Sequence, residues 1–328
     1  MLKIVKIFLI LYFFSTVSHF LYAENEYPNS VKLNGHLNVK GNSLINQSGE
    51  AVQLKGVSSF WLNWHGEFSN ASSIKYLKEE WGISIFRAAM GVEEEFGYLE
   101  NPLDMVKKVE EIIKICIKEN IYIVVDYHSH EANKNIKEAK KFFNYISKKY
   151  GKYPNIIYEV WNEPLKISWD DEIRPYMLEI IRTIRSNDKD NIILLGTPYW
   201  CQRVDEAFKN PIKEKNIMYT AHFYTGTHKD ELRNNLEEQW KAGCPIFISE
   251  FGVSIYDGGT LDRNVYLEEA DLWIDWMEKR KISWLTWSLC DKDESSALLS
   301  PGASETGNWK EEELSKAGKY IKNKINSN

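Results

Sequence analysis

The sequence predicts a single closed (β/α)8 barrel with a short N-terminal β-hairpin, and three observations lead to this fold class. Eight apolar, β-branched or aromatic runs alternate with helical stretches of 3.6-residue periodicity, a pattern typical of a parallel sheet covered by helices. Eight strands in about 300 residues fit a closed barrel better than an open sheet. Finally, no glycine-rich phosphate-binding turn follows the first strand, which disfavours an open doubly wound sheet.

The hairpin is predicted from the segment HLNVKGNSLINQSGEAVQLKG at residues 36–56. Apolar and polar residues alternate there around Gly41-Asn42 and Gly49, as expected for two short strands joined by a turn. We expect this hairpin to lead directly into the first strand of the barrel.

The eight strands of the barrel follow in order. We expect them at residues 53–58, 83–88, 122–127, 156–160, 192–196, 217–224, 246–249 and 284–288. The clearest helical periodicity lies between them in NPLDMVKKVEEIIKICIKEN, DEIRPYMLEIIRTIRSND and LEEADLWIDWMEKRK. Because no low-complexity linker interrupts the pattern, we expect residues 24–328 to form one domain with no additional module.

Residues 1–23 have the features of a secretion signal. Lys3 and Lys6 precede an uncharged apolar run at residues 7–14, and Ala23 offers a small residue at the cleavage position. The apolar run is too short to span a bilayer, although an uncleaved anchor is an alternative because Leu21 is large for its position. We therefore expect a secreted, extracellular protein that is not held at a membrane once the signal is removed.

The composition narrows the class of partner. A net charge of −6 and a pI near 5.8 argue against nucleic-acid binding. Twelve tryptophans is a high number, and flat indole faces either fill a core or stack on sugar rings. The four cysteines show neither metal-ligand spacing nor a paired pattern, and Cys116 is expected to be a core residue.

Polar side chains fall at the ends of successive predicted strands. The carboxyl ends of barrel strands open onto one face, where barrel enzymes build their sites. One polar residue past a strand means little, but the whole set indicates a common site. Its members are Arg87, His128, Asn162, Glu163, Trp200, His222, Tyr224, Glu250 and Trp287.

Two glutamates in this set stand directly on strands rather than on helical faces. Glu163 ends the fourth strand in YEVWNEPL, and Glu250 ends the seventh in PIFISEFG. Either one alone is more simply explained as a structural ion pair. Together, two carboxyl groups facing each other across a pocket are what glycosidic bond cleavage requires, since one protonates the leaving oxygen and the other attacks or activates water.

The motifs YEVWNEPL, VVDYH, IFRAAM, TAHFYTGTH, FISEFG, WSLCDKDESSA and LSPGASETGNW occur in order along nearly the whole chain from His36. In these motifs the sequence resembles the secreted cellulases of glycoside hydrolase family five, in particular the bacterial-type endoglucanases. The resemblance implies a (β/α)8 barrel, no metal or organic cofactor, and hydrolysis of β-1,4-glucan with retention of configuration. We also expect the enzyme to be a monomer.

The resemblance assigns roles to residues at matching positions. Glu163 would be the general acid and base, and Glu250 the nucleophile with Arg87 beside it. The implied substrate-binding residues are Arg87, His128, Asn162, His222, Tyr224, Trp287, Trp64, Trp200 and Lys292. Asn162 would bond the sugar 2-hydroxyl, Tyr224 would reach the nucleophile and Trp287 would stack beneath the sugar.

Three positions depart from the common family pattern. Phe251 stands where many relatives have tryptophan, Phe60 where many have histidine, and Gly91 where many have tyrosine. For the two carboxyls we expect a separation of about 5–5.5 Å. We also expect Glu163 to hold its proton to higher pH than Glu250, because Arg87 and Tyr224 compensate the charge of Glu250.

Three other functions fit parts of the sequence. A metal-dependent barrel hydrolase could use His128, His130, His222 and Asp291 as ligands, but it would leave the two glutamates without a role. A glycan-binding barrel that does not cut its ligand is a second alternative. The third is the same chemistry on another β-glycan, such as mixed-linkage glucan, xylan or mannan.

Overall fold

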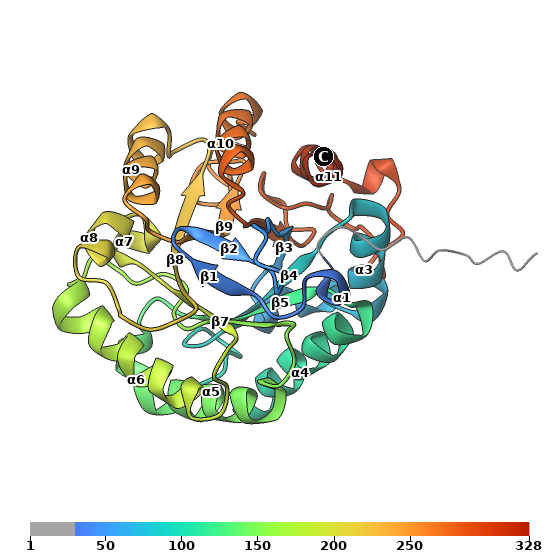
Figure 1. The fold of residues 1–328 in the computed structure, drawn as a ribbon. Helices are drawn as coiled ribbons and strands as arrows, with labels where there is room; N and C mark the ends of the chain where they lie inside the picture. Colours follow the sequence, from blue (N-terminus) through green and yellow to red (C-terminus); the bar gives the residue numbers. More distant parts are fainter. Residues whose placement is uncertain (1–29, 328) are drawn as a thin grey trace, which may run out of the picture.

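Eight parallel strands close into a barrel, as predicted. The computed structural model describes residues 30–327, and the strands follow one another around the barrel in the order β10-β3-β4-β5-β6-β7-β8-β9. Each strand is hydrogen-bonded to the next one along the chain, and β10 closes the ring against β3. The helices form a ring around the barrel (Figure 1).

All eight predicted strands are present; β8 has the predicted bounds, and the ends of the others differ from prediction by at most three residues. Their bounds are β3 Lys55–Ser59, β4 Ile85–Gly91, β5 Tyr122–His128, β6 Ile156–Glu159, β7 Ile192–Leu195, β8 Ile217–Tyr224, β9 Ile246–Gly252 and β10 Trp284–Leu289. β4 and β9 extend furthest beyond prediction at their carboxyl ends. These are the ends at which the predicted site residues lie.

The three most periodic stretches are helical. They form α4 Pro102–Glu119, α6 Arg174–Arg185, which is preceded by the π-turn η4 Trp169–Ile173, and α10 Leu267–Arg280. The other long helices are α5 Ile136–Tyr150, α9 Asp230–Lys241 and α11 Lys316–Asn326. The short helical elements are α1 Val31–Asn34, α2 Leu62–His65, η1 Gly66–Phe68, α3 Ala71–Tyr76, η2 Leu77–Trp81, η3 Ala132–Asn135, α7 Pro198–Cys201, α8 Val204–Lys209 and η5 Glu311–Glu313.

The predicted hairpin covers the amino-terminal end of the barrel. β1 Asn38–Lys40 pairs antiparallel with β2 Ser43–Ile45, and both lie across the front of the barrel in Figure 1. Leu37 and Leu44 of this region pack with Ile85 and Tyr122, residues near the start of barrel strands. The hairpin therefore closes one end of the barrel and leaves the carboxyl ends of the strands for the site.

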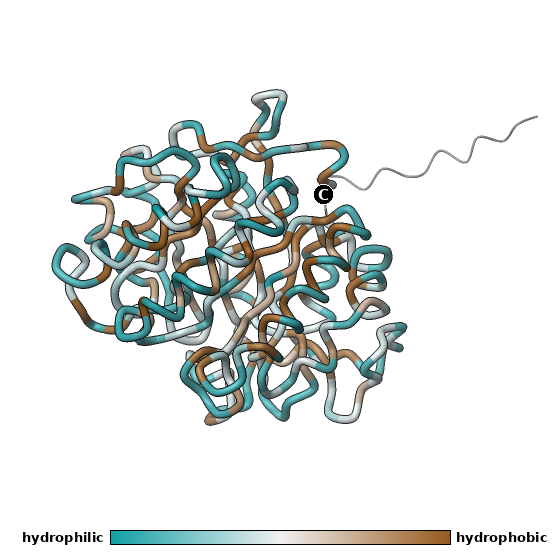
Figure 2. Tube along the Cα trace, turned by 90° about the horizontal axis from the view of Figure 1, so that it is seen from below, coloured by the Kyte–Doolittle hydropathy of each residue, from teal (hydrophilic) through white to brown (hydrophobic). Residues whose placement is uncertain are grey.

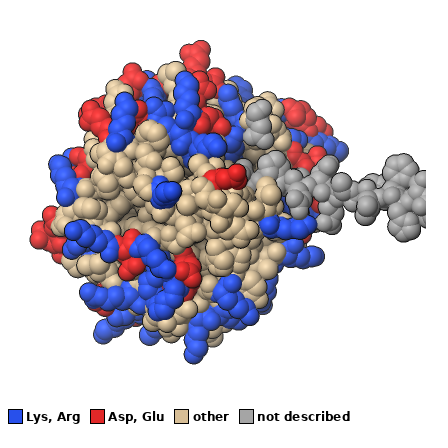
Figure 3. Space-filling view, viewed as in Figure 1, with Lys and Arg blue, Asp and Glu red and all other residues tan. Residues whose placement is uncertain are grey.

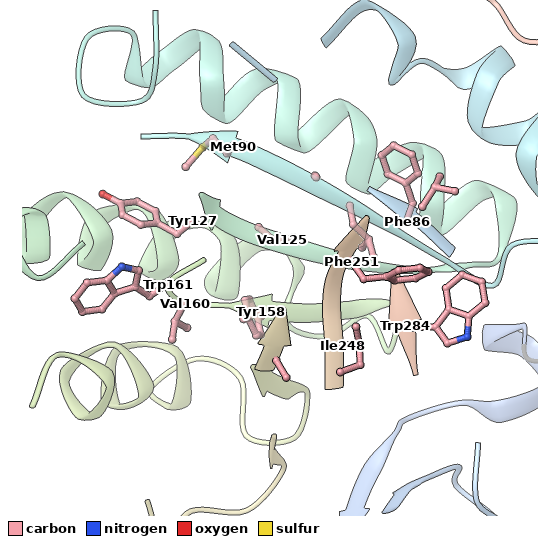
Figure 4. Close-up of a cluster of buried hydrophobic side chains, with 14 of the residues drawn as sticks. Phe86, Met90, Val125, Tyr127, Tyr158, Val160, Trp161, Ile248, Phe251 and Trp284 are labelled. Atoms are coloured by element: carbon pink, nitrogen blue, oxygen red, sulfur yellow. The ribbon is translucent and has the colours of Figure 1, made fainter. Parts of the chain in front are cut away.

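The main core lies between the barrel strands and the surrounding helices. Its buried side chains alternate along each strand, for example Phe86, Ala88 and Met90 on β4 (Figure 4). Hydrophobic residues concentrate in the interior of the tube drawn in Figure 2, and hydrophilic residues concentrate on its outer turns. Four tryptophans are fully buried core residues: Trp81, Trp161, Trp273 and Trp284.

The surface carries charges of both signs (Figure 3), and the cysteines are buried. On the hairpin side of the molecule, acidic and basic side chains are interspersed around an uncharged centre (Figure 3). All four cysteines are buried and unpaired, and Cys116 lies in the core as predicted. Among residues 30–327, no helix combines the length and hydrophobicity needed to cross a bilayer. The predicted signal at residues 1–23 lies outside the described residues.

Candidate active site

The predicted site residues meet at the carboxyl ends of the barrel strands. Asn162 and Glu163 lie three and four residues past the end of β6, and their backbone N–H groups bond the carbonyls of Tyr127 and Ser129 at 3.2 Å, so that the chain continues alongside β5. Glu250 lies on β9. Ligand atoms of Glu163, Glu250 and His222 all lie within 4.8 Å of one another, so the two predicted carboxylates do face each other.

A close approach between loops holds the segment after Glu163. Gly196, just past β7, lies so near that an added Cβ would sit 2.2 Å from the Trp161 carbonyl and 2.8 Å from Pro164 Cδ. The Pro164 carbonyl in turn accepts a bond from the Trp200 N–H at 2.9 Å. The proline thus packs against the next loop and fixes the direction in which Glu163 leaves the strand.

Arg87 is the centre of a buried ion-pair network. Its guanidinium lies 2.7 Å from Glu159, 2.9 Å from Asp126 and 3.0 Å from Glu250. It also donates to Asn162 Oδ1 at 2.5 Å. The planar, multi-donor geometry of arginine suits contacts with several carboxylates in one plane. Arg87 is completely buried, and its predicted place beside Glu250 is confirmed.

Glu250 is held on both of its oxygens. Arg87 Nη1 bonds Oε2, and the Tyr224 hydroxyl donates to Oε1 at 2.8 Å, as predicted. Burial nevertheless raises the pKa of Glu250 above its ordinary value, and the negative charge of Glu163 adds to this. His222, Arg87 and Tyr224 offset only part of the rise.

Glu163 is held by two imidazoles. His222 Nδ1 lies 2.9 Å from Oε1, and His130 Nε2 lies 3.3 Å from Oε2. Burial raises the pKa of Glu163, but the bonds to His130 and His222 outweigh burial and lower the pKa well below its ordinary value. The expectation that Glu163 holds its proton to higher pH than Glu250 is therefore wrong for this arrangement, because the sequence did not show that His130 and His222 both contact Glu163.

A hydrogen-bond chain continues from Glu163 behind the site. His222 Nε2 bonds Ser249 Oγ at 2.8 Å, and Ser249 donates to Glu159 Oε1 at 2.5 Å. Burial raises the pKa of Glu159, but Arg87 and the bonds of His222 and Ser249 lower it overall. The two facing carboxylates are thus connected through buried, charged partners.

An aromatic wall lies on one side of the site. Trp287 stacks on the His128 ring with centroids 5.2 Å apart and planes 6° apart, and Phe60 lies 5.3 Å from Trp287. His128 is fixed by Asp126, which bonds its Nδ1 at 2.6 Å. Trp64 extends the wall outward, 6.5 Å from Phe60, with 41% of its surface exposed.

Lys292 and the departures at positions 60 and 91 belong to the same wall. The Lys292 ammonium lies 4.6 Å over the Phe60 ring and 2.9 Å from Glu294. A Cβ on Gly91 would sit 2.0 Å from Asn63 Oδ1 and 3.0 Å from the Trp61 ring. The missing side chain at position 91 therefore leaves the space that Asn63 and Trp61 occupy.

Trp200 lines the cavity beside the two carboxylates, together with Glu163 and Glu250. Tyr199, Trp200 and Cys201 all have left-handed backbone angles, with φ between 52° and 59°, and this turn follows β7. Lys166 lies 5.6 Å from the Trp200 ring. The cavity has a volume of about 420 Å³ and is lined by His130, Glu163, Trp200, Gln202, His222, Tyr224, Thr227, His228, Glu250 and Tyr256.

Several residues of the site were not predicted from the sequence. Glu159, Asp126 and Ser249 complete the ion-pair and hydrogen-bond network, while His130 and Trp61 contact Glu163 and His128 respectively. A usable signal existed for Glu159, since a glutamate inside the apolar run IIYEVW must be buried and paired. The sequence indicated His130 only as a candidate metal ligand and gave no signal for Trp61, because both residues lie in loops.

The ligand set of the metal hydrolase is not assembled. His128 Nδ1 is bonded to Asp126, and Asp291 accepts the Gly302 N–H at 2.9 Å. Among residues 30–327, the group with ligand atoms close enough for a metal ion is Glu163, His222 and Glu250, within 4.8 Å. We assign these atoms to the facing carboxylates and their hydrogen-bond partners.

The fold and the site define a closed parallel barrel with a pair of facing carboxylates at the carboxyl ends of its strands. The family described as cellulase (glycosyl hydrolase family 5) matches residues 45–293. Endoglucanase A of Evansella cellulosilytica is 46% identical over 84% of this chain and 57% of its own length. An endoglucanase of Clostridium saccharobutylicum is 41% identical over 89% of this chain and 65% of its own length.

Solved structures agree with these sequence matches. A structure from Cytophaga hutchinsonii, 44% identical, superposes with a TM-score of 0.88 over 90% of this chain and 95% of its own. The catalytic domain of Thermobifida fusca endoglucanase Cel5A, 32% identical, has a TM-score of 0.86 over 90% of this chain and 99% of its own. The chain belongs to glycosyl hydrolase family 5. It spans 57–66% of the length of the first five curated relatives it matches.

Proposed function

We propose that the protein is a secreted endo-β-1,4-glucanase, a cellulase that hydrolyses internal β-1,4-glucosidic bonds with retention of anomeric configuration. One observation carries the proposal: carboxyl oxygens of Glu163 and Glu250 lie within 4.8 Å of each other and of a His222 ring nitrogen. Retaining glycosidases separate their carboxyls by about 5–5.5 Å, whereas inverting enzymes need about 6.5–9.5 Å for a water molecule.

In the first half-reaction, a Glu250 oxygen attacks the anomeric carbon while the bond from that carbon to the glycosidic oxygen breaks. The proton on Glu163 moves to the departing oxygen. Arg87 and Tyr224 hold Glu250 in line for the attack and stabilise its ionised form. Trp287 offers a flat apolar face beneath the sugar, and Asn162 is the candidate partner of the 2-hydroxyl.

The relatives support the choice of substrate. Those with the highest identities are named endoglucanases, and one solved structure of the Thermobifida fusca Cel5A domain holds cellotetraose. A chain of β-1,4-linked glucose units also suits the exposed indole of Trp64 and the half-buried indole of Trp200 at the cavity, since each can stack on a sugar ring.

The test is a reducing-sugar assay with carboxymethylcellulose, barley glucan, xylan and glucomannan. Glu163→Gln and Glu250→Gln should each lower hydrolysis of the preferred glycan by about a thousandfold or more while the barrel stays folded. Glu179→Gln, which changes a carboxylate on the surface of α6, is the matched control and should be fully active. Near-full activity of either site variant would refute the proposal.

The same experiments distinguish the proposed function from its alternatives. Preference for xylan, mannan or mixed-linkage glucan would keep the mechanism and change the substrate. Loss of activity after treatment with a chelator, restored by a divalent cation, would favour a metal-dependent hydrolase. A protein that binds cellooligosaccharides but cuts none of the four polysaccharides would favour a glycan-binding barrel.

Secretion and a monomeric state are part of the proposal. The positive and apolar character of residues 1–23 supports export, and mass spectrometry of protein from the culture medium should find a mature amino terminus near residue 24. Light scattering should give the mass of one chain. Retention of the protein in the cell pellet would contradict secretion, and a dimeric mass would contradict the monomeric state.

A further inference from the structure

His130 is a second imidazole on Glu163, and its position differs from that of His222. His222 bonds Glu163 Oε1 at 2.9 Å and is itself fixed through Ser249 at 2.8 Å, deep inside the barrel. His130 bonds the other oxygen, Oε2, over a longer distance of 3.3 Å. Each carboxyl oxygen therefore has its own imidazole, one buried and one at the cavity.

The His130 ring is placed to move, while its backbone is fixed. Its side chain is 32% exposed and lines the cavity with Trp200 and Gln202. Its backbone N–H is bonded to Glu93 Oε1 at 2.7 Å, which anchors the loop independently of the ring. A rotation about the His130 side-chain bonds would separate the ring from Glu163 without moving the chain.

A leaving group must compete with His130 for the same oxygen. Oε1 of Glu163 is bonded to His222, which is buried and fixed through Ser249, whereas Oε2 is bonded to the partly exposed His130, so we take Oε2 as the oxygen that a glycosidic oxygen reaches. His130 Nε2 already bonds Oε2. Binding of the leaving-group sugar therefore displaces the His130 contact, and departure of that sugar allows the contact to form again.

We propose that His130 is a positioning residue that bonds Glu163 when no leaving group contacts Oε2, and so favours the base form of Glu163 in the second half-reaction. This inference rests on the proposed function. In that half-reaction, a water oxygen bonds the anomeric carbon, the bond from that carbon to Glu250 breaks, and a water proton moves to Glu163 Oε2. The base must be ionised before it can take this proton.

The charges around His130 agree with this role. Glu163 faces it from the loop after β6, Glu250 from β9, His222 from β8, Glu93 from the loop after β4, and His128 from β5. Its sequence neighbour Glu131 is ion-paired with Lys134. Burial lowers the pKa of His130, but the bond to Glu163 and the charges of the three glutamates raise it overall. The contact therefore raises the pKa of the imidazole and lowers the pKa of the carboxyl that it joins.

The contact with His130 also explains how Glu163 can have a lowered pKa and still act as an acid. With His130 in contact, the pKa of Glu163 is lowered, which suits a base. With the contact displaced by a leaving group, one of the two lowering bonds is lost, and the pKa of Glu163 rises toward what an acid needs. One carboxyl can thus serve both half-reactions because its partner changes with the occupancy of the cavity.

The test uses His130→Gln with a dinitrophenyl β-cellobioside, whose leaving group needs no protonation. The second half-reaction then limits kcat, while kcat/KM reports the first. The variant should lose about three- to tenfold in kcat and keep kcat/KM within about twofold. The acidic limb of kcat should move to higher pH by about half a unit or more, because Glu163 ionises less readily without the imidazolium.

His36→Gln is the matched control, since His36 is exposed and lies just before the hairpin at the other end of the barrel. It should leave both constants and the pH profile unchanged, and His130→Ala should reproduce the effects of His130→Gln. Unchanged kcat, or equal losses in kcat and kcat/KM without a pH shift, would overturn the inference. If Glu163→Gln and Glu250→Gln were active, the proposed function itself would fail; if they are inactive, a null result at His130 refutes only this inference.

Discussion

Replacing Arg87 with lysine tests the buried ion-pair network behind the site. Arg87 Nε, Nη2 and Nη1 lie 2.7, 2.9 and 3.0 Å from Glu159, Asp126 and Glu250. A single ammonium cannot take up all three contacts, because it lacks the planar fork of the guanidinium. Arg87→Lys therefore leaves at least one buried carboxylate without its partner.

The size of the effect follows from the burial of these groups. Arg87, Asp126 and Glu159 are fully buried, and breaking a buried ion pair costs about 3–5 kcal/mol. At about 2 °C per kcal/mol for a domain of this size, the melting temperature should fall by about 6–10 °C near neutral pH. Arg182→Lys, with an ion pair at 70% exposure, is the control and should change stability by less than about 0.5 kcal/mol.

The loss of stability in Arg87→Lys should decrease as the pH falls. Burial raises the pKa of Glu159, but Arg87 and other partners lower it below the ordinary value of 4.5. A depressed folded pKa contributes stability that is present above the unfolded pKa and is lost as the pH falls through the folded value. The gap between wild type and Arg87→Lys should therefore be largest near neutral pH and close as the pH falls below 4.5.

Thermal unfolding followed by circular dichroism at several pH values measures this gap. A variant within about 1 kcal/mol of wild type at neutral pH would refute the reasoning, because the network would then contribute no more than a surface pair. A gap that widens toward acid pH would also refute it, since the carboxylates would then not be the groups that depend on Arg87.

Three further predictions concern the site and the core. Tyr224→Phe removes a bond that lowers the pKa of Glu250, so the acidic limb of kcat/KM should move up by about one unit; an unchanged limb would argue against that bond. Trp200→Ala should raise KM for cellooligosaccharides by about tenfold with a smaller change in kcat, and equal losses in kcat would contradict a binding role. All four cysteines are buried, and burial raises the pKa of the Cys201 thiol to about 11 and that of Cys290 to about 12. Iodoacetamide should therefore label none of the four cysteines in the native protein and all four in the unfolded protein. Labelling of the native protein would contradict the burial.

The sequence predicted the barrel well because its signals are local. Each strand is a short apolar run, each helix has a periodic face, and both patterns survive without knowledge of distant contacts. The strand ends were placed less well, as at Gly91 and Gly252, because the last ladder bonds depend on neighbouring strands. The facing of Glu163 and Glu250 could be predicted because all strand ends in such a barrel share one face.

What the sequence could not supply is the partner of each charged group. His130 and His222 are far apart along the chain, yet both contact Glu163, and this reverses the expected order of proton affinities. Similarly, the glycine at position 91 gave no indication that Asn63 and Trp61 occupy the space that a larger side chain would need there. Electrostatic tuning depends on distances of 3–4 Å between loops, and such distances carry no local sequence signal.

The central claim is that Glu250 forms a covalent bond with the sugar. A dinitrophenyl cellobioside with fluorine in place of the hydroxyl next to the anomeric carbon should slow the second half-reaction and trap the glycosyl-enzyme. Mass spectrometry of the intact protein should then show one added fluorocellobiosyl group, and the peptide map should place it on Glu250. No adduct with an otherwise active enzyme, or an adduct on Glu163 or any other residue, would contradict the account.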